Sequence, residues 1–225
     1  MLKYILLTGA ITWPLLITAQ VHVRDEPRHH NVFENEFIRI LDVHLRPGDT
    51  TLYHLHNTPS VFITLANVKV GSQLTGQQPQ KGANLSSLTM YDAIATPRIH
   101  RVWNDDTSWF HVMDIELIIG QPKNNVELID ASDLKLNDDQ IITLFNEKLV
   151  TGYKMKFSKG QTMKLPSSKS GYLLVSTGNA FVDITLNGTI QHRNMKAGHY
   201  VWLDGKQTTI ITSNAIADYI LLQLK

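Results

Sequence analysis

Two histidines separated by one residue carry the clearest chemistry in this sequence. His54 and His56 flank Leu55, and residues two apart in a β-strand project to the same face. Two neighbouring imidazoles form half of a site for Zn, Fe, Ni, Cu or Mn. A third imidazole, that of His100, completes a facial set if the segment 97–104 forms a later strand of the same β-domain.

The other histidines lack this support. His44 and His111 lie in strand-like runs and could line the same interior, but neither belongs to a motif, so we expect surface or hydrogen-bonded positions. Three more are expected in a solvated N-terminal segment, namely His22, His29 and His30. The two adjacent ones, His29 and His30, could bind a metal weakly there.

Two acidic residues are further candidates. Asp114 and Glu116 share one face of a predicted strand, and either could act as a base if that face points inward. The sequence contains no Gly-rich phosphate loop and no nucleophile-elbow motif. Phosphate-loop and serine-hydrolase chemistry are therefore not predicted.

The elements that would position these residues are short β-strands. Apolar and β-branched runs alternate with turns rich in Gly, Pro and Asn, which is typical of an all-β sandwich or barrel. The predicted strands are 37–45, 50–56, 61–65, 91–95, 109–119, 153–157, 172–176, 180–186, 200–203, 208–212 and 217–224. A turn or two of helix is expected around 138–146, and no long amphipathic helix is predicted.

The sequence repeats itself. When Gly48 is set on Gly160, the apolar pattern of 32–50 falls on that of 144–162, and 110–117 falls on 217–224 with a slightly smaller offset. We therefore predict two homologous β-domains. The positions of His54, His56 and His100 hold other residues in the second copy, namely Pro166, Ser168 and Gln207, so the second domain is predicted to lack this metal site.

These motifs resemble those of the cupin family. Gly48, five residues and then His54-Leu55-His56 resemble the first half of cupin motif 1, and 97–104, with Asn104 following His100 at the motif's spacing, resembles motif 2. The sequence departs from the family where motif 1 usually has a glutamate, since Ser60 and Val61 stand there, and where Ile99 replaces the usual glycine of motif 2. Ser60 could instead hydrogen-bond a metal-bound water.

The resemblance implies a fold and a cofactor. It implies all-β architecture with two cupin (double-stranded β-helix, or jelly-roll) barrels in tandem, the second degenerate. It also implies one divalent transition metal ion (Fe, Mn, Zn, Ni or Cu) held by His54, His56 and His100. Three-histidine sites in the family often hold ferrous iron, which makes a dioxygenase the leading expectation and an isomerase or lyase the next.

Composition narrows the remaining classes. The chain has no cysteine, so disulfides, thiolate ligands and a cysteine nucleophile are excluded. Its 21 basic and 20 acidic residues leave a formal net charge of +1 with no local basic cluster, so a nucleic-acid partner is not expected.

The ends of the domains can be placed approximately. Residues 1–19 have the Lys3 n-region, apolar stretch and small residues of a secretory signal peptide, so a periplasmic or secreted protein is expected, with no membrane association after cleavage near Ala19. The metal-binding barrel is then expected over 20–125 and the degenerate barrel over 126–225. A homodimer is a family-based expectation.

Three functions remain open at this stage. The first is a metal-dependent enzyme that binds a small oxygen-rich substrate. The second is a non-catalytic protein that binds a small ligand or a metal, which the absent glutamate and the degenerate second domain also fit. The third is a structural or interaction role in which the histidines are incidental.

Overall fold

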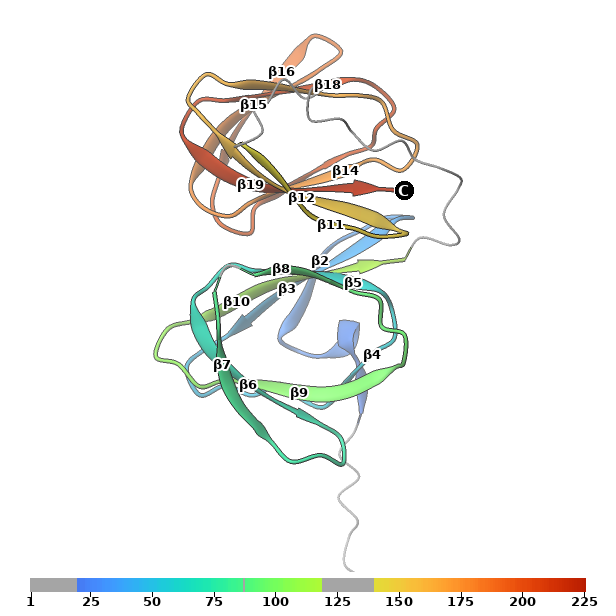
Figure 1. Ribbon diagram of the computed structural model, residues 1–225, viewed down its shortest axis with the longest axis vertical. Coiled ribbons are helices and arrows are strands. Elements are labelled where there is room, and N and C mark those ends of the chain that lie inside the picture. The colour runs from blue at the N-terminus through green and yellow to red at the C-terminus, as the bar shows by residue number, and fades with distance from the viewer. Residues whose placement is uncertain (1–19, 87, 119–139) are drawn as a thin grey trace, which may run out of the picture.

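The structure is a computed structural model that describes residues 20–86, 88–118 and 140–225. These residues form two β-barrels stacked along the long axis of the molecule (Figure 1). The predicted signal peptide and the boundary predicted at 125/126 lie outside the described residues. None of the helices in the described part of the chain has the length and hydrophobicity needed to cross a membrane.

The first barrel consists of two five-stranded sheets. One sheet has the strand order β1 (Val21–His22), β4 (His54–His56), β9 (Arg98–Asn104), β6 (Val68–Leu74) and β7 (Gln80–Leu85). The other has the order β2 (His29–Glu34), β3 (Ile38–Leu45), β10 (Phe110–Leu117), β5 (Ser60–Thr64) and β8 (Thr89–Asp92). A short 3₁₀ helix, η1 (Val23–Asp25), leads from β1 to β2.

The second barrel has the same plan. Its five-stranded sheet runs β11 (Ile141–Asn146), β12 (Val150–Phe157), β19 (Ala217–Leu224), β14 (Tyr172–Ser176) and β17 (Tyr200–Leu203). The four-stranded sheet runs β13 (Thr162–Leu165), β18 (Thr209–Ser213), β15 (Ala180–Leu186) and β16 (Thr189–Met195). The helix expected around 138–146 is wrong, because β11 occupies 141–146 and completes the sheet beside β12.

Strand registers confirm the internal repeat. Leu45 pairs with Phe110 in the first barrel, and the corresponding residues, Phe157 and Ala217, pair in the second. Gly48 and Gly160 both have φ of 78°, a left-handed conformation that glycine adopts without steric cost. The all-β, two-barrel architecture predicted from the sequence is confirmed.

The residue of the second barrel that corresponds to His100 is not Gln207, as predicted, but lies two residues further along the chain. The amide of Gly48 donates to the carbonyl of Asn104, and that of Gly160 donates to the carbonyl of Ser213. Counting back equally from Asn104 and Ser213 places Thr209 opposite His100. The offset taken from the last strand did not apply to β18, because the turns before and after this strand differ in length between the copies.

The second barrel is filled by its own side chains. Phe157 and Tyr219 are fully buried, and their rings meet edge to face with centroids 5.4 Å apart. The larger buried cluster around them includes Met155, Met163 and Leu221. This barrel is thus a packed core.

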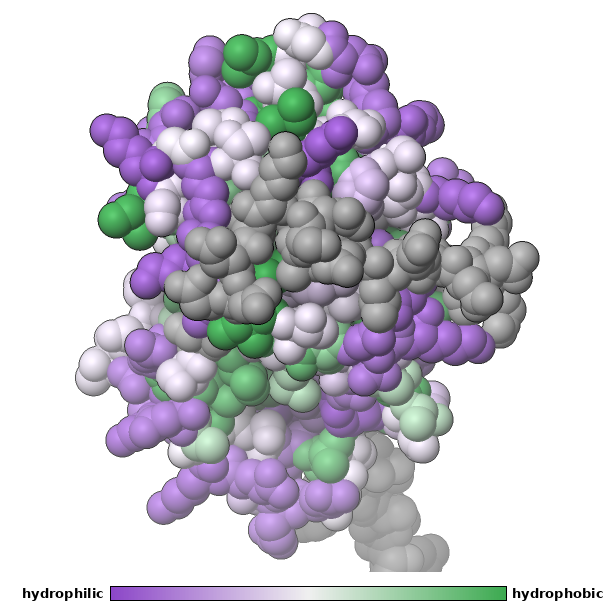
Figure 2. All heavy atoms as spheres, turned by 45° about the horizontal axis from the view of Figure 1, so that its top comes forward, coloured by the Kyte–Doolittle hydropathy of each residue, from purple (hydrophilic) through white to green (hydrophobic). Residues whose placement is uncertain are grey.

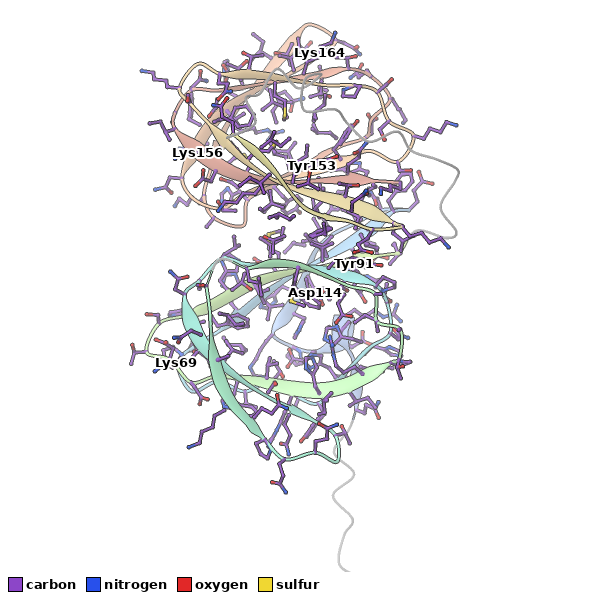
Figure 3. All side chains as sticks on the ribbon, in the orientation of Figure 1. Lys69, Tyr91, Asp114, Tyr153, Lys156 and Lys164 are labelled. Carbon is purple, nitrogen blue, oxygen red and sulfur yellow. The ribbon has the colours of Figure 1, made fainter. Side chains whose placement is uncertain are left out.

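A second apolar layer joins the barrels. Buried side chains of β3, β5 and β10 pack against those of β12, β14 and β19, with Ile115 and Leu222 among them. Tyr91 lies at this junction, 6.1 Å from Phe145 between ring centroids (Figure 3). On the outside, hydrophilic side chains project from both barrels (Figure 2).

Candidate metal centre

Strand β4 places two of the predicted ligands in the interior of the first barrel. His54 is 1% exposed and His56 2% exposed, and they share one strand face as their spacing predicts. Pairing of β4 with β9 puts His100 directly opposite His54. The ring centroid of His100 lies 4.7 Å from that of His54 and 4.9 Å from that of His56. The structure therefore brings the three histidines together.

A fourth histidine joins them from β2. His29 is 7% exposed, and its ring centroid lies 4.7 Å from that of His54. The ligand atoms of His29, His54 and His56 all lie within 4.8 Å of one another, so this buried cluster could bind a metal. The expectation that His29 lies in a solvated segment is wrong, because β2 pairs with β3 and carries His29 into the barrel.

Hydrogen bonds orient two of these rings. The Nδ1 of His29 donates to Glu26 Oε2 at 2.7 Å, and the Nδ1 of His54 donates to the carbonyl of Leu52 at 2.8 Å. Each bond fixes the tautomer that leaves Nε2 with a free lone pair, which is the usual arrangement behind a metal-bound histidine. The residues present therefore fit a metal ion.

Burial keeps His54, His56 and His100 uncharged. Desolvation, together with the neighbouring histidines, lowers the pKa of His54 to about 4 and that of His100 to about 3, and it holds the pKa of His56 still lower. These three imidazoles are thus neutral near pH 7, as metal ligation requires. His56 Nδ1 and His100 Nε2 are buried and have no hydrogen-bond partner among the described residues.

Glu26 holds His29 in place and is itself ionised. Burial opposes its negative charge, but hydrogen bonds from His29 and from the backbone amides of Leu52 and Arg28 lower its pKa to about 2. Sequence reasoning missed both Glu26 and His29. The internal repeat could have indicated that His29 points inward, because its offset sets His29 on Ile141. Ile141 packs against the core of the second barrel.

Replacing Glu26 with glutamine is expected to weaken metal binding. The amide keeps the shape of the side chain but not the charge that orients and polarises His29, so affinity should fall roughly 10–100-fold. Competition with a chromophoric chelator measures the change. Glu34→Gln is the matched control, because Glu34 lies on β2 together with His29 but pairs with Arg39 at the surface. Equal affinities of Glu26→Gln and the parent would contradict this role.

Asp114 is a second acidic residue beside the cluster, next to His56. It lies inside the first barrel on β10 (Figure 3), and its Oδ2 is 3.6 Å from His56 Nδ1. Burial and the nearby Glu116 raise its pKa to about 8. Glu116, on the same strand face, accepts a hydrogen bond from Arg39 at 2.6 Å and is thereby engaged in an ion pair. Of the two acids, Asp114 has the position expected of a base near the metal.

Asp114→Asn is expected to stabilise the chelator-treated protein increasingly as pH rises. Between about pH 4 and pH 8 the unfolded chain ionises this carboxyl while the folded chain keeps it protonated, so the unfolding free energy of the parent falls across that window. The advantage of the variant should grow by on the order of 2 kcal/mol, or about 5 °C in Tm, from pH 5 to pH 8. A difference in Tm between parent and variant that stays constant from pH 5 to pH 8 would contradict the assignment. Asp204→Asn, at an exposed position, is the control.

Ser60 stands where the family motif usually has a glutamate. It is fully buried at the start of β5, and its Oγ donates to the carbonyl of Thr58 at 3.2 Å. A hydroxyl bonded in this way is a poor metal ligand. The proposed bond from Ser60 to a metal-bound water remains a prediction.

An apolar pocket of about 160 Å³ adjoins the histidines. Its walls come from both sheets of the first barrel and consist largely of aliphatic and aromatic side chains, among them Val43, Phe62, Val70, Val102, Phe110 and Val112. It meets a wider hollow of about 460 Å³ that Phe62, Met90 and His100 also line and that Arg98 and Asp92 border. The cluster thus faces a space that a small organic molecule can enter.

Residue size explains why the interior of the second barrel is filled over the residues that the structure describes. By strand register, Val43, Val112 and Asp114 of the first barrel correspond to Met155, Tyr219 and Leu221 of the second. Each replacement in the second barrel is larger or apolar, and together they fill the interior.

Comparisons with solved structures identify the fold. YhhW from Escherichia coli superposes with a TM-score of 0.56 at 13% identity, over 84% of this chain and 82% of that one. Salicylate 1,2-dioxygenase from Pseudaminobacter salicylatoxidans gives 0.56 at 10% identity, over 83% and 71%. A cupin 2 conserved barrel domain protein from Leptotrichia buccalis gives 0.53 at 11% identity, over 87% and 88%. No protein-family model matches the sequence, and no curated protein does.

The chain therefore has the two-barrel fold of the bicupins, as the sequence motifs predicted. Its first barrel contains a buried three-histidine group that could bind a metal. Identities this low establish the fold alone.

Proposed function

We propose that the protein is a metal-dependent cupin enzyme of dioxygenase type that acts on a small molecule with an apolar body and adjacent oxygen donors. One divalent transition metal would be held by His54 and His56 together with His29, His100 or both. The observation that carries the proposal is a buried histidine cluster open to an apolar pocket. Salicylate 1,2-dioxygenase among the similar structures supports the choice of chemistry.

The pocket and the donor set have complementary roles in this proposal. When bound, the metal supplies Lewis acidity toward oxygen donors and a site for dioxygen. The apolar walls exclude water and pack against the body of the substrate. Asp114, whose pKa is raised to about 8, can accept or release a proton beside His56 near neutral pH.

Arg98 is proposed to bind an acidic group of the substrate. It lies on the same face of β9 as His100, and its Nη1 donates to Asp92 Oδ2 at 2.8 Å. Its Nε is buried without a hydrogen-bond partner in the described part of the chain. A guanidinium with a free donor at the entrance of an apolar pocket is suited to a carboxylate.

Arg98→Gln is accordingly expected to raise KM for an acidic substrate roughly 10–100-fold, the effect of losing one charge-assisted hydrogen bond. The kcat should change little, because Arg98 positions the substrate without entering the reaction. Arg101→Gln is the control, since Arg101 projects to the opposite face of the strand and binds Gln73. A large fall in kcat with KM unchanged would contradict this role.

Oxygen consumption by the metal-loaded protein tests the proposed activity. The panel should contain salicylates, catechols, flavonoids and keto acids, with product identified by mass spectrometry. Turnover of one class that Asp114→Asn slows would support the proposal. Tight binding of a panel member without turnover would overturn it and establish the alternative, a non-catalytic ligand-binding cupin, which the serine at position 60 favours.

A further inference from the structure

Two histidines and an aspartate gather on the opposite face of β3 and β10 from the candidate metal centre. His111 pairs directly with His44 across these strands, and Asp42 lies two residues before His44 on the same face. The Nε2 of His111 is 2.8 Å from Asp42 Oδ1, and the Nε2 of His44 is 3.1 Å from Oδ2. The ligand atoms of the three residues all lie within 4.8 Å of one another.

The ring geometry favours a common ligand. The imidazoles of His44 and His111 stack with centroids 4.0 Å apart and an interplanar angle of 23°. Both direct Nε2 toward the Asp42 carboxylate, one ring to each oxygen, so the donor atoms of the three residues converge.

The group of Asp42, His44 and His111 lies at the edge of the apolar layer between the barrels. Ile38 and Ile40 precede Asp42 on the same face of β3 and are buried in that layer. From the second barrel, the turn at Gly198 packs so closely that a Cβ there would lie 2.7 Å from His111 Cε1. Asp42 also lines a hollow with His199 of that barrel. The three side chains are half-buried, so an ion from solvent can reach them.

We propose that Asp42, His44 and His111 form a second binding site for a divalent transition metal, with Zn²⁺ as the expected ion. Two imidazoles and one carboxylate are a common ligand set for such ions and leave positions for water. The site is independent of the histidine cluster in the first barrel, because the β3–β10 layer separates them. A bound ion would fix the rim of the first barrel beneath the Gly198 turn of the second.

Zn²⁺ titration of a variant without the first site tests the proposal. In tag-free His54→Ala/His56→Ala protein, one equivalent of Zn²⁺ should still bind in competition with a chromophoric chelator, and it should raise Tm. Adding His111→Ala should abolish both effects. Adding His192→Ala instead is the matched control, because His192 bonds Asp183 on the surface without a second histidine.

Two outcomes would overturn the proposal. The first is absence of Zn²⁺ binding by the folded His54→Ala/His56→Ala variant, which would leave Asp42 as a hydrogen-bonded partner of two histidines. The second is that the variant still binds one equivalent of Zn²⁺ after His111→Ala has been added. If the double variant does not fold, His44→Ala/His111→Ala in the parent gives the same test, and bound Zn²⁺ should fall from two equivalents to one.

Discussion

Replacing His54 and His56 together with alanine is expected to remove one equivalent of bound transition metal. These imidazoles are almost fully buried, carry no charge near pH 7 and lie beside His29 and His100. The loss of two of the ligands should weaken metal binding on the order of a thousandfold or more. Elemental analysis of tag-free protein after equilibration with each metal measures the effect.

The control for this experiment comes from the same end of the chain. His22 and His30 are exposed histidines, so His22→Ala/His30→Ala should keep the full metal content. Circular dichroism should show that both double variants retain β-structure. Unchanged metal content in folded His54→Ala/His56→Ala would contradict the assignment of the first-barrel centre.

Phe157→Ala is expected to destabilise the protein strongly without weakening metal binding in the first barrel. Phe157 is fully buried in the second barrel and contacts Tyr219, so truncation loses apolar burial and leaves a cavity. The expected cost is about 3–5 kcal/mol, which lowers Tm by about 10 °C in a chain of this size. Denaturant unfolding and calorimetry measure it.

Phe181→Ala is the control, because Phe181 is an exposed phenylalanine of the same barrel and its truncation should cost under about 1 kcal/mol. A small effect at position 157 would show that the second barrel is not tightly packed. A matching loss of metal affinity in Phe157→Ala would show that the second barrel shapes the first-barrel centre directly.

The local pattern of the sequence was sufficient to predict His54 and His56. Strand alternation alone places both side chains on one face, although β4 begins only at His54 and not directly after the turn at Gly48. His100 followed from a second motif, although only the pairing of β4 with β9 shows that it lies opposite His54. These predictions depend on contacts within strands or between adjacent strands.

His29 and Glu26 could not be predicted in the same way. Their position depends on η1 and on the pairing of β2 with β3, neither of which has a strong local signal. The pocket also depends on relative side-chain size. Val112 and Tyr219 occupy equivalent positions, and only the assembled barrels show that one interior is open and the other is filled.

Anomalous diffraction from metal-loaded crystals tests the central claim most directly. We expect an anomalous peak inside the first barrel about 2.0–2.3 Å from the ligand nitrogens of His54 and His56, with His29, His100 or both completing the set. The peak should disappear in His54→Ala/His56→Ala crystals grown under the same conditions. Ordered His54 and His56 side chains with no peak between them, in protein loaded with each metal in turn, would contradict the account.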